Sequence, residues 1–158
     1  MPTILALDLG TTTGWALLER RSHEIRSGSI CFRQTHFDSS DSKFTRFKRW
    51  LLNLKMTQDG FDHIVYEAVR NHNGTIAGQT YGGFMATLHL FGDHHKIPYE
   101  GVSVGTIKKF ATGKGNASKF HMIKAIEEKG HQPIDDNEAD ALALLYWAMA
   151  QEDSTHDF

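Results

Sequence analysis

Short apolar segments separated by tight turns fill the first 32 residues and restrict what the chain can build. Residues 3–9 form an apolar run that a glycine-bounded turn over 10–14 interrupts. Residues 15–18 and 28–32 are two further apolar runs. Because no helical spacing separates these segments, they predict three strands in an antiparallel meander.

Helical patterns and two more strands follow. Residues 42–54 place apolar side chains at helical spacing, with basic residues on the other face. Residues 63–67 read as a fourth strand, 76–94 as a long helix and 99–102 as a fifth strand. Three further helices complete the chain. This order of strands and helices predicts a mixed five-stranded α/β sheet flanked by helices.

The beginnings of those last three helices are left open by the sequence. The candidate first residues are Ser103 or Thr106, Asn116 or Ser118, and Pro133 or Asp135. The three helices are expected to run through 110, 129 and 148 respectively.

The 158 residues, 40% of them hydrophobic, predict one domain over 1–151 and a loose tail over 152–158. Cys31 is the only cysteine, which favours a reducing compartment and excludes a zinc finger. No signal peptide is evident at the N-terminus, and no apolar run approaches the ~20 residues that a bilayer requires. We therefore expect a cytoplasmic protein that does not enter a membrane.

The net charge of −2 hides a strong asymmetry. Residues 135–158 hold seven acids and no Lys or Arg, so the first 134 residues hold 17 basic residues against 12 acids. The basic residues concentrate in two sets: Lys43, Arg46, Lys48, Arg49 and Lys55, and Lys108, Lys109, Lys114, Lys119, Lys124 and Lys129. Each set alone is compatible with a solvated helix face. Because the basic residues are concentrated in this way, the slightly negative net charge does not exclude a nucleic-acid ligand.

Three acidic residues lie beside segments that should be buried. Asp8 ends the first apolar run, Glu67 ends the fourth strand, and Asp140 precedes an Ala-Leu stretch of the last helix. Taken singly, these acids have ordinary explanations. Asp8 could cap its turn, Glu67 could form an ion pair with Arg70, and Asp140 could lie at the solvent-exposed rim of its helix. Taken together, they predict an oxygen-rich pocket for hard cations such as Mg²⁺ or Mn²⁺. Two such ions can catalyse phosphodiester hydrolysis.

Three segments carry a resemblance to a known family. Residues 4–10 with Gly14, residues 64–67 and residues 138–143 resemble the RuvC family of Holliday-junction resolvases, within the RNase H-like superfamily. The resemblance covers nearly the whole chain. It implies an RNase H-like fold, two Mg²⁺ ions per active site with Mn²⁺ as a substitute, and a homodimer that cuts four-way DNA junctions. The host would be a bacterium or a phage-infected cell.

The resemblance also assigns metal ligands. Asp8, Glu67 and Asp140 match the family's catalytic, metal-binding carboxylates, whereas Asn137 stands where the family usually has an acid or a histidine. Asp136 lies four residues before Asp140 and would share its helix face, so it is the candidate for the fourth carboxylate. Asp135 and Glu138 are expected to be surface acids.

Basic residues complete the expected site. Lys108 and Lys119 match positions near the scissile phosphate, with Lys109 and Lys114 beside them. Phosphate contacts of this kind supply affinity without reading sequence. The loop after Glu67 contains Arg70 and His72 as candidate DNA contacts but no aromatic wedge. Small residues over 76–86 suit either a dimer helix or close packing within one chain.

Other functions remain open at this point. A related nuclease would act on RNA or RNA–DNA hybrids, and a catalytically weak relative would bind junctions without cutting them. Residues 8–13 also resemble the first phosphate loop of sugar kinases and actin-like ATPases. That fold needs two such domains to enclose ATP, and this chain supplies one.

Overall fold

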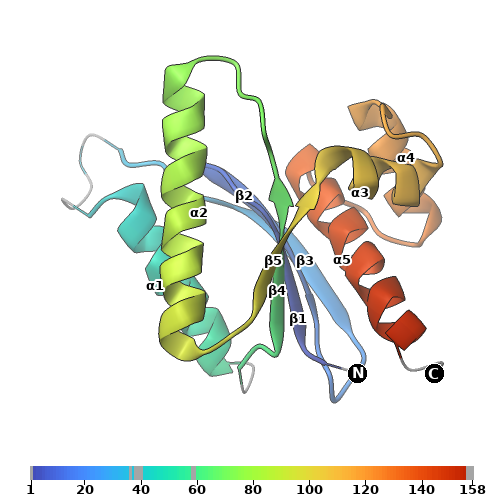
Figure 1. Ribbon diagram of the computed structural model, residues 1–158, viewed down its shortest axis with the longest axis horizontal. Helices are drawn as coiled ribbons and strands as arrows, with labels where there is room; N and C mark the ends of the chain where they lie inside the picture. The colour runs from blue at the N-terminus through green and yellow to red at the C-terminus, as the bar shows by residue number, and fades with distance from the viewer. Residues whose placement is uncertain (1, 36, 38–40, 58–59, 156–158) are drawn as a thin grey trace.

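A five-stranded mixed sheet lies between two groups of helices (Figure 1). This computed structural model describes residues 2–35, 37, 41–57 and 60–155. The strands are β1 (Ile4–Asp8), β2 (Thr12–Leu18), β3 (Ile25–Cys31), β4 (His63–Ala68) and β5 (Tyr99–Ser103). Their order across the sheet is β3-β2-β1-β4-β5. The first three are antiparallel neighbours, and β4 and β5 continue the sheet in parallel. The predicted mixed α/β sheet is confirmed.

Helices cover both faces of this sheet. They are α1 (Lys43–Thr57), α2 (Thr75–His95), α3 (Val104–Thr112), α4 (Lys119–Glu128) and α5 (Asp136–Thr155). Helices α1 and α2 lie on one face, and α5 lies on the other with α3 and α4 packed beside it (Figure 1). Within the described residues, no helix has the length and apolar character needed to cross a membrane.

The alternation of side chains along β1 divides the core into two layers. Ile4 and Ala6 face α5, whereas Leu5 and Leu7 face α1 and α2. All four are fully buried. A strand covered on both faces reads as an uninterrupted apolar run, which is why the polar end of β1 at Asp8 stands out in the sequence.

The second strand begins earlier than predicted. It starts at Thr12, so residues 12–14 are strand rather than turn. The turn is short because the Thr13 hydroxyl donates a hydrogen bond to the Gly10 carbonyl, at 2.7 Å. Gly14 then pairs with Asp8 on one side and with Ser29 on the other. The glycine that suggested a turn instead marks a close contact between sheet and helix.

Capping side chains show where α3, α4 and α5 begin. The Ser103 hydroxyl accepts a hydrogen bond from the Thr106 N–H, and the Ser118 hydroxyl accepts one from the His121 N–H. For α5, Asp135 Oδ1 accepts from the Glu138 N–H at 2.8 Å, so the helix begins at Asp136. Asp135 is half-buried and caps α5.

The last helix extends into the segment predicted as a tail. It continues through Thr155, past the expected domain boundary at 151. Two side chains donate to backbone carbonyls within this stretch, Ser154 to Ala150 and Thr155 to Glu152. Residues 156–158 lie outside the described part of the chain.

We expect Gly14→Ala to lower the free energy of unfolding by about 2 kcal/mol or more. A Cβ at this position would lie 1.9 Å from the backbone oxygen of Asn137, so the sheet or the start of α5 must shift. Urea unfolding followed by circular dichroism measures the effect.

Gly105→Ala is the matched control, because its Cβ would have 4.0 Å to the nearest atom, a Gly115 oxygen. It should keep or raise stability by up to about 1 kcal/mol. Equal effects of the two substitutions would contradict the close contact at Gly14.

Candidate active site

Three carboxylates meet at one end of the sheet. Asp8 ends β1, and Glu67 lies one residue before the end of the neighbouring parallel strand β4. Asp140 lies about one turn inside α5, which packs on that face. One oxygen from each of the three lies within 4.8 Å of the others. The convergence predicted from the sequence is confirmed for these three residues.

Strand register explains why two of them meet. Leu7 on β1 is paired with Tyr66 on β4, and both side chains face α1 and α2. Because side chains alternate along a strand, the next residue of each strand, Asp8 or Glu67, faces α5. Their positions are therefore set by the same alternation that builds the core.

Buried contacts fix the start of α5 against the sheet. Glu138 is 7% exposed. Its Oε1 accepts a hydrogen bond from the Ser27 hydroxyl at 2.8 Å, and its Oε2 accepts one from the Ile134 N–H at 2.6 Å. The prediction that Glu138 is a surface acid was wrong, because helix periodicity alone does not reveal a partner on a strand 111 residues away. This carboxylate sets the position of the helix that carries Asp140.

Burial disfavours charge on all three carboxylates, and repulsion adds to this effect at Asp8 and Asp140. Burial raises the pKa of Asp8 well above its usual value, and the negative charges of Glu67 and Asp140 raise it further. Burial also raises the pKa of Glu67, although the hydrogen bond with Asp8 and the charge of Lys108 oppose the shift. The pKa of Asp140 rises to about 7, first through burial and then through repulsion from Glu67 and Asp136. Such a site is a strong candidate for function.

The chemistry of this site fits divalent metal ions. All the converging groups are carboxylate oxygens, the ligands that Mg²⁺ and Mn²⁺ prefer. Among the described residues, none of the three acids has a Lys, Arg or His nitrogen within 4.0 Å. A cation bound between them would remove the repulsion that raises their pKa values.

Asp136 lies beside this cluster but outside it. Its carboxylate is 3.1 Å from Lys119 Nζ, and it is not among the three acids that converge. Its negative charge nevertheless raises the pKa of both Asp8 and Asp140. The neighbouring Asn137 is half-buried, with its backbone against Gly14. A role for Asp136 as a fourth ligand stays a prediction.

Lys108 and Lys109 lie on α3, Lys114 lies in the segment between α3 and α4, and Lys119 begins α4. Lys108 is half-buried, and its charge lowers the pKa of Glu67 and Asp140. Lys119 is exposed and pairs with Asp136. Lys109 and Lys114 are exposed. The structure thus brings two of the four lysines, Lys108 and Lys119, within electrostatic reach of the acids.

The loop after β4 lies at the same end of the sheet. Figure 1 shows it as the green arch that leads from β4 to α2. Arg70 is exposed, and the half-buried His72 ring packs against Tyr81 with 4.8 Å between ring centroids. The Tyr81 hydroxyl donates to the Glu67 carbonyl at 2.8 Å and accepts from the Val69 N–H at 3.2 Å.

Tyr81 therefore anchors the base of this loop beside Glu67. The sequence did not single it out, because a tyrosine at a helical core position carries no mark of such a contact. An open groove of about 460 Å³ runs alongside, between the turn after Asp8 and the start of α2. His72 and the exposed Ile76 are among its lining residues.

Comparisons with solved structures identify the same fold. The chain is similar to Thermus thermophilus RuvC in complex with a Holliday junction substrate, with a TM-score of 0.74, 14% identity and coverage of 91% of this chain and 90% of that one. A second T. thermophilus RuvC structure gives 0.70 at 14% identity, covering 90% of each chain. The yeast mitochondrial Holliday junction resolvase Ydc2 gives 0.58 at 12% identity, covering 89% of this chain and 75% of that one.

The sequence itself matches no family model and no curated protein. The likeness is therefore one of fold, and the predicted RuvC-like fold is confirmed. The acidic cluster, described above from the geometry of this chain alone, lies within that architecture.

We expect the metal-free protein to lose stability as the pH rises from about 4 to above 7. The folded state holds protons on the acid cluster that the unfolded chain releases near the ordinary Asp value of 3.8, so folding binds protons in this window. Asp140→Asn should flatten this dependence and raise stability at pH 8 by about 2 kcal/mol.

Urea unfolding in chelator between pH 5 and 8 measures both effects. Asp153→Asn, at an exposed position near the end of α5, is the matched control and should follow the wild type. A wild type that gains stability over this pH range would contradict the electrostatics of the cluster.

Proposed function

We propose that this protein is a metal-dependent endonuclease that resolves four-way or branched DNA junctions. The observation that carries the proposal is the cluster of Asp8, Glu67 and Asp140 at one end of a RuvC-like fold. A similar solved structure is that of a RuvC protein bound to a Holliday junction substrate. The reaction is phosphodiester hydrolysis that leaves 5'-phosphate and 3'-hydroxyl ends.

Asp8, Glu67 and Asp140 would hold the metal ions, with Asp136 as the fourth carboxylate. Two Mg²⁺ ions, or Mn²⁺ in their place, would lower the pKa of the attacking water and stabilise the leaving 3'-oxygen. The chain's own contribution is a fixed arrangement of oxygens, because strand register and the buried Glu138 leave little freedom in their positions.

The lysines of α3 and α4 would bind the DNA backbone. Lys108 already acts electrostatically on Glu67 and Asp140, so a phosphate at the acids lies within its reach. Lys119 can exchange its contact with Asp136 for one with the scissile phosphate. Lys109 and Lys114 would contact phosphates farther along the same strand, while Arg70 and His72 approach the DNA from the loop on the other side.

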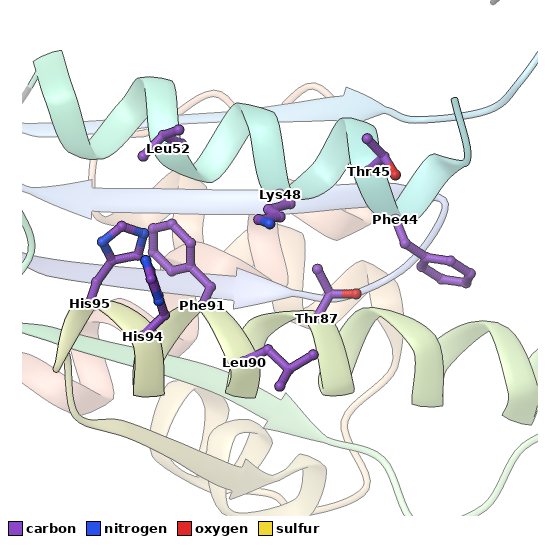
Figure 2. Close-up of a pocket in the computed structure, with 9 residues that line it drawn as sticks. All are labelled: Phe44, Thr45, Lys48, Leu52, Thr87, Leu90, Phe91, His94 and His95. Carbon is purple, nitrogen blue, oxygen red and sulfur yellow. The ribbon is translucent and has the colours of Figure 1, made fainter. Parts of the chain in front are cut away.

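A homodimer would place two such sites on one junction, and the face formed by α1 and α2 suits this contact. Figure 2 shows a groove between the two helices, with a volume of about 620 Å³. Leu90, which lines it, is 70% exposed. The other lining residues are Phe44, Thr45, Lys48, Leu52, Thr87, Phe91, His94 and His95.

The small residues of α2 divide between the two roles that the sequence left open. A Cβ at Gly83 would lie 2.3 Å from the Phe44 ring, so this glycine serves packing within one chain. A Cβ at Gly82 would meet nothing within 4 Å. Of these two glycines, only Gly82 has room for close approach by a partner helix.

Two alternatives have specific observations in their favour. The RNase H-like fold is shared with nucleases that cut RNA or RNA–DNA hybrids, and Asn137 brings no charge where the family usually has an acid or a histidine. Cleavage assays with a labelled four-way junction, a duplex, a hybrid and folded RNA separate the nucleases. Binding of the junction without cleavage in both Mg²⁺ and Mn²⁺ would instead indicate a catalytically weak binding protein.

We expect Asp8→Asn to reduce junction cleavage by more than about a hundredfold, because the variant lacks one proposed ligand of the catalytic ions, while leaving junction binding intact. The measurement compares cleavage of a labelled junction in Mg²⁺, Mn²⁺ and chelator with binding in chelator. Asp153→Asn serves as the charge-matched control and should cleave like the wild type. Full activity of the Asp8 variant would overturn the assignment.

We expect Leu90→Glu to dissociate the homodimer, because the new carboxylate would be buried at a contact without a partner. Light scattering across a range of protein concentrations measures the mass. Met56→Glu is the control, since Met56 is 72% exposed on α1 and does not line the groove. A monomeric wild type, or equal behaviour of the two variants, would contradict this interface.

A further inference from the structure

An exposed phenylalanine directly follows Lys119, the lysine that contacts Asp136. Phe120, near the start of α4, is 68% exposed. The packing of α4 against the core is made instead by Met122 and Ile126, which are almost completely buried. Among the described residues, the one ring that contacts Phe120 is that of the neighbouring His121, in an edge-on arrangement with ring centroids 5.7 Å apart. The face of this ring is therefore available for contact with a ligand.

Two lysines of α4 flank Phe120. The preceding residue, Lys119, reaches Asp136 with 3.1 Å between Nζ and the carboxylate, and it feels the charges of Asp140 and Asp8. Lys124 follows one helical turn after Phe120 and is also exposed. The acids of α4, Glu127 and Glu128, lie about 10 Å farther along the helix axis.

Two other exposed apolar side chains belong to the same group of helices or to the segment that leads into α5. Phe110, on α3, is 44% exposed and follows Lys108 and Lys109. Ile134, just before α5, is 79% exposed. Figure 1 shows α3 and α4 next to the beginning of α5, toward the end of the sheet to which the β4 arrow points. The β4–α2 loop on the other side contains no aromatic residue over 68–74.

We propose that Phe120 stacks on an unpaired or branch-point base of the DNA while Lys119 and Lys124 hold the adjoining phosphates. The proposal rests on the proposed function and extends it from phosphate contacts to a base contact. An aromatic ring between lysines is the combination that binds single-stranded nucleic acid, because every base offers a face for stacking and every nucleotide carries a negative charge. A fully paired helix has no free base face to offer. Phe120 therefore selects branched or unpaired DNA over duplex.

The test compares Phe120→Ala with the wild type in chelator, on a four-way junction, a single strand and a paired duplex. Loss of one stacked base corresponds to about a tenfold weaker binding of the junction and the single strand. Duplex binding should stay within about twofold. The salt dependence should be unchanged, because no phosphate contact is lost.

Three further variants separate stacking from other effects. Phe120→Trp should retain wild-type binding, whereas Phe120→Leu should resemble Phe120→Ala, because leucine is apolar but has no aromatic face. Met56→Ala, an exposed apolar residue on α1, should bind like the wild type. A 2-aminopurine placed next to the branch point should change its fluorescence on binding wild type but not on binding Phe120→Ala.

Several outcomes would overturn the stacking role. They are an equal loss of duplex binding, unimpaired junction binding by Phe120→Ala, wild-type behaviour of Phe120→Leu, or a change in the mass of Phe120→Ala by light scattering, which would assign the ring to a protein contact. Failure of the proposed function has a different signature: the wild type would not cleave the junction in Mg²⁺ or Mn²⁺. The binding comparisons are made in chelator and test Phe120 in either case.

Discussion

Mutual repulsion among Asp8, Glu67 and Asp140 is the constraint around which this fold is organised. Burial raises the pKa of all three carboxylates, and the charge of Glu67 raises the pKa of both Asp8 and Asp140 further. Left to itself, the arrangement would relax by moving one acid away. Two strands and one helix prevent this, because each acid is attached to an element whose apolar residues are fully buried. The hydrophobic core thus holds together groups that would otherwise separate.

The contact between α5 and the sheet has to be close for this to work. Gly14 allows the backbone of Asn137 to approach β2 where any side chain would collide with it. Glu138 then joins Ser27 on β3 to the segment that leads into α5. These contacts do not involve the three converging carboxylates, yet they determine where Asp140 lies relative to Asp8. The α5 residues that make them therefore lie within three positions of Asp140 in the sequence.

Much of the fold and the main acids could be predicted because both leave marks in the local pattern. Apolar runs predicted the strands, and Asp8 and Glu67 stood out as charged residues at the ends of two of those runs. Glu138 was misjudged and Tyr81 was missed, because their roles depend on partners distant in the chain. The start of β2 was misplaced for the same reason: Gly14 looks like a turn residue unless the helix packed against it is known.

The order of elements along the chain gives the Glu138–Ser27 contact a consequence for folding. All five strands precede residue 104, whereas Asp140 and its anchor belong to the last helix. The contact joins residues 111 apart, so it closes one of the longer loops in the molecule. The acid cluster is complete only when α5 is packed on the sheet, because Asp140 belongs to that helix. A chain that lacks this last helix would expose the apolar face of the sheet that α5 covers.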